Sequence, residues 1–133
     1  MLDTNVLIAA LRSASGASYQ LLLAADRGEF EVALSVPLLA EYDDVSTRLS
    51  SGITIPATAV DAIIRRIAML AHKQPIYFLW RPVLPDPKDD MVLELAIASG
   101  ASHIVTFNQK DLHLAAQFGI SVLMPSKFIQ LLP

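Results

Sequence analysis

The sequence predicts a single α/β domain over residues 1–133, in which helices cover both faces of a five-stranded parallel sheet. The chain is long enough to bury one core and too short for two ordinary domains. Its hydrophobic fraction of 53% excludes a disordered chain. Apolar stretches with helical spacing alternate along it with short β-type runs, which is typical of a parallel sheet between helices.

The expected elements follow one another without a repeat, a low-complexity tract or a linker. The first strand is the stub that ends at Asp3, and four β-type runs follow it: EVALS, PIYFLW, HIVTF and ISVLMP. Helical spacing occurs in residues 17–28, 38–49, 58–72, 92–100 and 112–119. The third helix is the clearest, with an apolar stripe formed by Val60, Ile63, Ile64, Ile67 and Ala71.

Composition and motifs exclude several classes of protein. The chain has no cysteine, so we expect no disulfide framework, thiolate metal site or thiol nucleophile. Charged residues interrupt every long apolar stretch and the start does not resemble a signal peptide, so we expect a cytoplasmic protein with no membrane segment. No dinucleotide-binding, Walker or nucleophile-elbow motif is present, and His72, His103 and His113 lack zinc-ligand spacing.

The net charge of −3 provides no global positive field for nucleic acid, so any surface that binds a polyanion must be local. Arg65, Arg66, His72 and Lys73 cluster beside the third helix. A solvated helix face explains this cluster better than a nucleic-acid site does.

Three polar residues, Asp3, Ser35 and Thr106, fall at the carboxyl ends of expected strands. Open α/β sheets bind ligands at such ends. Asp3 is followed by an apolar run, and burying a lone carboxylate is costly unless something pairs with it. Asp3 could cap the following helix, although Thr4 and Asn5 suit that role equally well. Thr106 could equally be an ordinary strand residue.

Two further acids, Glu41 and Asp90, lie on apolar faces of their helices and are therefore poorly explained as ordinary exposed residues. Glu41 lies at the edge of the apolar face of its helix, and acids are seldom buried unless they are paired. In the stretch LPDPKDDMVLELA, Asp86 suits a helix N-cap and Asp89 the third position of a capping box. Asp90 lies on the apolar stripe three residues before Leu93, so it is either a first-turn acid favoured by the helix dipole or a functional acid.

The stretch HIVTFNQKDLHLAA is ambiguous, because Asn108 could cap the next helix and Asp111 could be its third-position acid. If several of these carboxylates converged at one sheet edge, they would repel each other and raise their own pKa values. Mg²⁺ and Mn²⁺ prefer oxygen ligands and would remove this repulsion. We therefore hypothesise that a divalent cation pairs with Asp3.

The order of four pieces resembles a known family: LDTN at the start, a glutamate in the helix after the second strand, DPKDDMVLELA, and TFNQKDL. The chain is similar, nearly from end to end, to the PIN-domain ribonucleases, in particular to VapC-like toxin components of bacterial and archaeal toxin–antitoxin systems. This resemblance implies a single PIN-like domain, an α/β/α sandwich around a central five-stranded parallel sheet. It also implies a Mg²⁺- or Mn²⁺-dependent endoribonuclease that holds one or two ions and hydrolyses RNA.

The resemblance assigns roles residue by residue. The family acids that hold the metal match Asp3, Glu41, Asp90 and Asp111, the hydroxyl at the strand end matches Thr106, and Asn5 and Asn108 are auxiliary. The chain departs from the family in two places. Many relatives have an aspartate where this chain has Asn108, and relatives usually have more strand residues before the first acid, so either the start is assigned late or the first strand is short.

Two alternatives stand beside this assignment. LDTNVL also resembles phosphotransferases with an aspartate nucleophile, but those need a second aspartate where this chain has Asn5. A catalytically inactive PIN-like module that binds RNA or protein would explain Asn108 and the lack of a basic patch. The high apolar fraction also predicts a homodimer, and a toxin would have an antitoxin segment that blocks the acidic pocket.

Overall fold

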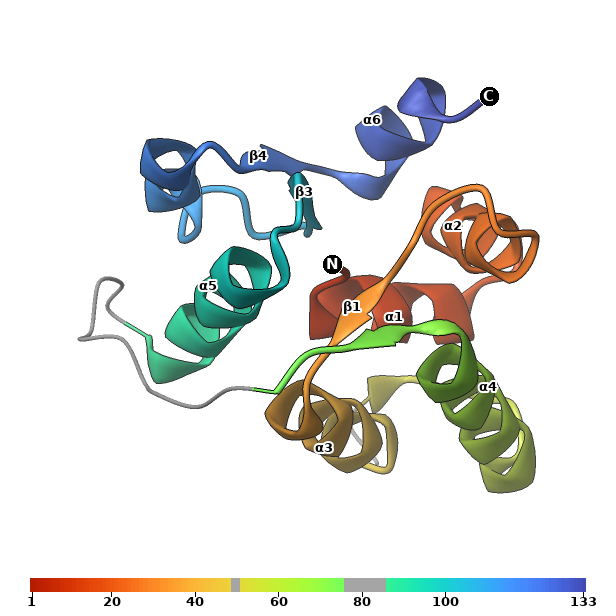
Figure 1. Ribbon diagram of the computed structural model, residues 1–133. Coiled ribbons are helices and arrows are strands. Elements are labelled where there is room, and N and C mark those ends of the chain that lie inside the picture. Colours follow the sequence, from red (N-terminus) through yellow and green to blue (C-terminus); the bar gives the residue numbers. More distant parts are fainter. Residues whose placement is uncertain (49–50, 76–85) are drawn as a thin grey trace.

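Helices and short strands alternate along the chain in the computed structural model, which describes residues 1–48, 51–75 and 86–133 (Figure 1). The α-helices are α1 (Thr4–Arg12), α2 (Ala17–Asp26), α3 (Val36–Ser46), α4 (Ala57–Leu70), α5 (Pro87–Ser99) and α6 (Pro125–Phe128). The strands are β1 (Ala33–Leu34), β2 (His72–Lys73), β3 (His103–Val105) and β4 (Ser121–Leu123). Two 3₁₀ helices, η2 (His113–Phe118) and η3 (Ile129–Leu131), complete the described elements.

Polar residues at strand ends start two of the helices. Asp3 caps α1 by accepting a hydrogen bond from the backbone N–H of Thr4, and Ser35 caps α3 by accepting one from that of Leu38 at 3.2 Å. Each cap directly follows a short paired segment, so the chain turns from strand into helix at the same edge of the fold. This edge is where the carboxyl ends of the strands meet.

The prediction of one five-stranded sheet is wrong for the described residues. They form two separate parallel pairs, β1 with β2 and β3 with β4. The stub joins only the second pair, through a single parallel bridge between Leu2 and Val105. Because α1 already begins at Thr4, the stub offers only three residues for pairing. The backbone N–H of Asp3 donates to the carbonyl of Val105 at 2.9 Å, and the backbone N–H of Val105 donates to the carbonyl of Met1 at 2.9 Å, so the stub pairs with β3. Figure 1 shows the N-terminus at the centre, between the two pairs.

The predicted strand PIYFLW lies almost wholly in residues 76–80, outside the described residues. The second strand of the first pair is instead β2, which the sequence analysis had placed at the end of the third helix. The three other predicted β-type runs each contain a strand: EVALS contains β1, HIVTF contains β3 and ISVLMP contains β4. The expected helix at residues 112–119 is the 3₁₀ helix η2, which ends at Gly119 with a positive φ of 74°.

The core lies where the helices meet the strands. The predicted stripe of α4 is confirmed, since Val60, Ile64 and Ile67 are all buried. Helix α5 packs against both β1 and β3 and so links the two strand pairs. Among the described residues no single helix is long and apolar enough to cross a membrane; α1 and α2 meet that test only as a pair bent by 102°.

Candidate active site

An acidic cavity of about 370 Å³ opens at the carboxyl ends of the stub and β3. Its polar lining consists of four acids, two amides, two arginines and one threonine: Asp3, Glu41, Asp86, Asp89, Asn5, Asn108, Arg12, Arg48 and Thr4. Four of the residues that the sequence analysis singled out, Asp3, Asn5, Glu41 and Asn108, are therefore brought together here.

Asp3 is buried, with 8% of its surface exposed, and each of its carboxylate oxygens accepts a hydrogen bond. Oδ1 accepts from the backbone N–H of Thr4 at 2.8 Å, and Oδ2 accepts from the hydroxyl of Thr106 at 2.7 Å. Burial raises the pKa of Asp3, the two hydrogen bonds lower it, and the charge of Glu41 raises it, with a net effect above the usual value. Asp3 thus caps α1, and its buried position disfavours the charged form of its carboxylate.

Thr106 organises the floor of this cavity, although it is fully buried behind the lining residues. Besides donating to Asp3, its Oγ1 accepts from the side-chain amide of Asn5 at 3.3 Å and from the backbone N–H of Asn108 at 2.9 Å. The backbone N–H of Phe107 also donates to Oδ1 of Asn5 at 3.3 Å. These bonds connect the start of α1 to the loop after β3, so Thr106 acts here as more than a strand former.

Glu41 reaches the site from α3. Its Oε2 accepts a hydrogen bond from the hydroxyl of Thr4 at 2.6 Å. The next residue, Tyr42, is fully buried and donates its hydroxyl hydrogen to the carbonyl of Leu2 at 2.5 Å. Burial, followed by the charges of Asp3 and Glu41, raises the pKa of Tyr42 above its usual value, so it remains a neutral donor. This bond fixes α3 against the stub and holds Glu41 beside Asp3.

The acid that α5 contributes to the cavity differs from the one that the sequence analysis favoured. Asp89 is 8% exposed and lines the cavity together with Asp86, whereas Asp90 is half-buried and does not line it. Burial and then the charges of Asp86, Asp3, Asp111 and Asp90 raise the pKa of Asp89 to about 6.

Helical phase was the signal that could have identified Asp89 from the sequence. Val92, Leu93 and Ala96 follow it by three, four and seven residues, and all three are buried in α5. A helix N-cap and a capping box also account for Asp86 and Asp89, so the sequence alone does not decide between a capping role and a place on the buried face.

The fourth predicted acid, Asp111, is exposed and does not line the cavity. Its charge contributes to the raised pKa of Asp89, so it lies near the site without forming its wall. Asn108 lines the cavity instead, and its backbone is bonded to Thr106. The structure therefore brings Asn108 to the position for which the sequence analysis preferred Asp111.

The donor chemistry of the cavity fits a hard divalent cation. Carboxylate and amide oxygens are the ligands that Mg²⁺ and Mn²⁺ prefer. Burial is the main cause of the raised pKa values of Asp3 and Asp89, and neighbouring carboxylates raise both further, so a cation would stabilise the charged form of each. Among the described residues, no three histidine, aspartate or glutamate side chains lie close enough together to hold a metal on their own. The fit is therefore to a hydrated ion, and Mg²⁺ commonly uses one or two carboxylates and keeps several waters.

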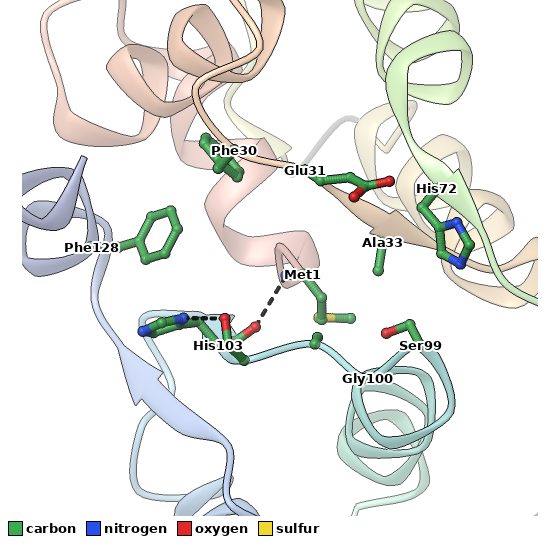
Figure 2. A pocket seen from close by; sticks show the side chains of 11 residues that line it. Met1, Phe30, Glu31, Ala33, His72, Ser99, Gly100, His103 and Phe128 are labelled. Atoms are coloured by element: carbon green, nitrogen blue, oxygen red, sulfur yellow. Dashed lines mark hydrogen bonds between the residues drawn. The ribbon is translucent and has the colours of Figure 1, made fainter. Parts of the chain in front are cut away.

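A second cavity, of about 390 Å³, lies at the opposite, amino-terminal edge of β1 and β3 (Figure 2). Phe30, Glu31, His72, His103 and Phe128 are among the residues that line it, and the amino group of Met1 donates to the carbonyl of His103 at 3.1 Å. None of the acids predicted for the site lines this cavity. The acids that the sequence predicts for the site therefore lie away from this second cavity.

Comparison with known proteins shows the family of the chain. A family model described as PIN domain matches residues 1–110, a range that contains every residue lining the acidic cavity and ends one residue before Asp111. PIN domains have a nuclease-like α/β fold, are generally nucleases and typically use divalent metal ions. A search of curated proteins and a search of solved structures each found no match. The family match covers far more than half of the 133 residues, and the chain therefore belongs to the PIN domain family.

Proposed function

We propose that this protein is a Mg²⁺- or Mn²⁺-dependent endoribonuclease that hydrolyses phosphodiester bonds of RNA. The observation that carries the proposal is the joint placement of Asp3, Glu41 and Asp89 around one cavity, with Thr106 bonded to Asp3 beneath it. Membership of a nuclease-like family supports the same reaction class.

The residues of the chain have distinct roles in this proposal. Asp3, Glu41 and Asp89 would hold a hydrated cation, directly or through its waters, and this cation when bound would lower the pKa of water and neutralise the charge that develops on the phosphate. Thr106 keeps Oδ2 of Asp3 in one orientation through its 2.7 Å bond. Asn5 and Asn108 present amide groups at the same wall, where they can donate hydrogen bonds to phosphate oxygens.

Two acids that the sequence analysis chose as ligands, Asp90 and Asp111, have a different role here. Both lie outside the cavity wall, yet their charges contribute to the raised pKa of Asp89. We assign them to the surrounding negative field, which strengthens the attraction for a cation without direct coordination.

The biological setting is part of the proposal. By its resemblance to VapC-like proteins, the chain would be the toxin of a toxin–antitoxin module, acting in the cytoplasm as a homodimer and inhibited by an antitoxin segment at the acidic cavity. The homodimer would cover exposed apolar side chains such as Val36, which is 82% exposed, or Met69, which is 73% exposed.

The alternative is a PIN-like module that binds RNA or protein without cutting. Two observations favour it. Asn108 lines the cavity at the position where many relatives have an aspartate, and no three acids among the described residues form a ready-made metal site. A cleavage assay separates the two functions.

The assay incubates the purified protein with structured and single-stranded RNA in either Mn²⁺ or EDTA. The nuclease cuts only in Mn²⁺, and Asp3→Asn abolishes cutting because it removes a ligand charge while keeping the shape. Asp43→Asn, which changes an exposed acid of α3 away from the cavity, is the matched control and retains activity. Equal degradation in Mn²⁺ and EDTA would reveal a contaminating nuclease, and binding without any cutting would favour the alternative.

A further inference from the structure

Two arginines line the otherwise acidic cavity. Arg12 is in the last turn of α1, and Arg48 lies just beyond the end of α3. Both helices start at the sheet edge that carries Asp3, and Arg12 is eight residues along α1 from Thr4, or about 12 Å at the rise of an α-helix. The cavity thus has acids at one end and cations further along its wall.

The guanidinium of Arg12 is held in place by the loop after α3. Its Nε donates a hydrogen bond to the carbonyl of Ser51, a buried residue. Gly52 follows with a positive φ of 75°, and a Cβ at this position would lie 3.2 Å from that same Nε. Gly52 therefore allows the loop to approach the guanidinium closely, and the bond to Ser51 uses Nε, while Arg12 remains part of the cavity lining.

Arg48 is held more weakly. Its Nη2 lies 2.6 Å from Oδ2 of Asp44, one turn earlier, and both side chains are about half exposed or more. Ion pairs of this exposed i,i+4 type contribute little to stability, so the guanidinium can exchange Asp44 for another anion at small cost. A phosphate in the cavity would be such an anion.

Resting on the proposed function, we infer that Arg12 and Arg48 bind backbone phosphates of a single RNA strand on one side of the bond that is cut. Guanidinium groups bind phosphate through two parallel hydrogen bonds. These contacts add affinity for a polynucleotide over a single nucleotide and set the direction in which the strand crosses the acids. They also supply the local positive surface that the net charge of −3 lacks.

The test measures binding of a fluorescent single-stranded RNA to the Asp3→Asn protein as a function of NaCl concentration. Each phosphate contact that is lost lowers the slope of log Kd against log salt by about 0.7 for a single strand. We expect this decrease for Arg12→Ala and for Arg48→Ala, and roughly twice this decrease for the double variant.

Arg65→Ala is the matched control for Arg48→Ala. Arg65 also forms an exposed i,i+4 ion pair, with Asp61 at 2.9 Å, but it lies on α4 and does not line the cavity. Its substitution leaves the salt slope unchanged. Arg12→Lys keeps a charge without the planar fork and recovers the slope but not the full affinity, which separates phosphate binding from a loss of loop structure.

The outcomes distinguish this inference from the proposed function. Unchanged slopes for both Arg12→Ala and Arg48→Ala overturn the inference, even if Mn²⁺-dependent cleavage is found. An equal decrease for Arg65→Ala also overturns it, because the effect would then be general electrostatics. If the decreases are confined to the Arg12 and Arg48 variants, and the protein without the Asp3→Asn change does not cut RNA in Mn²⁺, the inference is supported and the nuclease function is contradicted.

Discussion

Thr106 donates its hydroxyl hydrogen to Oδ2 of Asp3 at 2.7 Å, across 103 positions of the sequence. The bond connects the residue after β3 to the residue that caps α1, and both side chains are buried. Hydrogen bonds to a charged acceptor are stronger than neutral ones, so this contact both stabilises the fold and fixes the orientation of the carboxylate.

Replacement of Thr106 by valine tests this relationship. Valine keeps the shape but leaves Asp3, Asn5 and the backbone N–H of Asn108 without their partner. We expect a loss of about 1–3 kcal/mol in the free energy of unfolding, measured by urea denaturation, because a buried polar group is left unsatisfied. Thr106→Ser keeps the hydroxyl and should retain most of the free energy of unfolding that Thr106→Val loses. Valine and serine variants of equal stability would contradict the role of the bond.

The pH dependence of stability tests the environment of Asp89. Its pKa is raised from 3.8 in the unfolded chain to about 6 in the fold, so the folded protein binds more protons between these values. The free energy of unfolding of the metal-free protein should therefore fall as the pH rises from about 4 to about 6, and change little from this group above that window. Asp3, whose pKa is also raised, contributes in the same direction.

Asp89→Asn should remove much of this decline, so that the variant gains stability over wild type at pH 7 but not at pH 4. Asp43→Asn changes an exposed acid and should leave the decline in place. Thermal unfolding in EDTA at several pH values measures both. An unaltered pH profile in Asp89→Asn would show that Asp89 is not the titrating group.

Cleavage assays can decide between the two neighbouring acids of α5. Asp89 lines the cavity and Asp90 does not, so Asp89→Asn should reduce Mn²⁺-dependent cleavage by at least tenfold more than Asp90→Asn does, a difference of about 1.4 kcal/mol in the barrier. A larger loss of cleavage in Asp90→Asn than in Asp89→Asn would instead support Asp90 as the metal-binding acid of α5, as the sequence predicts.

Much of the site was predictable because its residues lie at strand ends, a local property. Asp3 and Thr106 follow β-type runs, and Glu41 lies on the edge of an apolar helix face, so each could be found within a short window. Asp89 precedes the buried residues Val92, Leu93 and Ala96 by three, four and seven positions, so its helical phase could have placed it on the buried face, but a capping role explained it equally well. The sequence did not single out Arg12 as a residue of the cavity, because the Ser51 and Gly52 that contact its guanidinium lie far along the chain.

The fold was predictable to a similar degree. Helical periodicity located α4 well, because its buried stripe extends over several turns. The single sheet was wrong because strand pairing depends on how far each segment remains extended, and β1 and β2 each span only two residues. The stub likewise turns into α1 after Asp3, before a second neighbour can pair with it.

The central claim is that the acids around Asp3 share one cation, and thermal unfolding with and without Mn²⁺ tests it most directly. In EDTA, Asp89→Asn should melt at or above wild type, because it removes charge repulsion. Asp3→Asn also removes repulsion and still caps α1, but its amide cannot accept from both Thr4 and Thr106, so it should melt near wild type. In millimolar Mn²⁺ the order should reverse, since only wild type gains the full stabilisation from binding. Asp43→Asn should follow wild type in both conditions. If Mn²⁺ leaves the order of melting temperatures unchanged in both variants, the acids do not share a cation and the claim is contradicted.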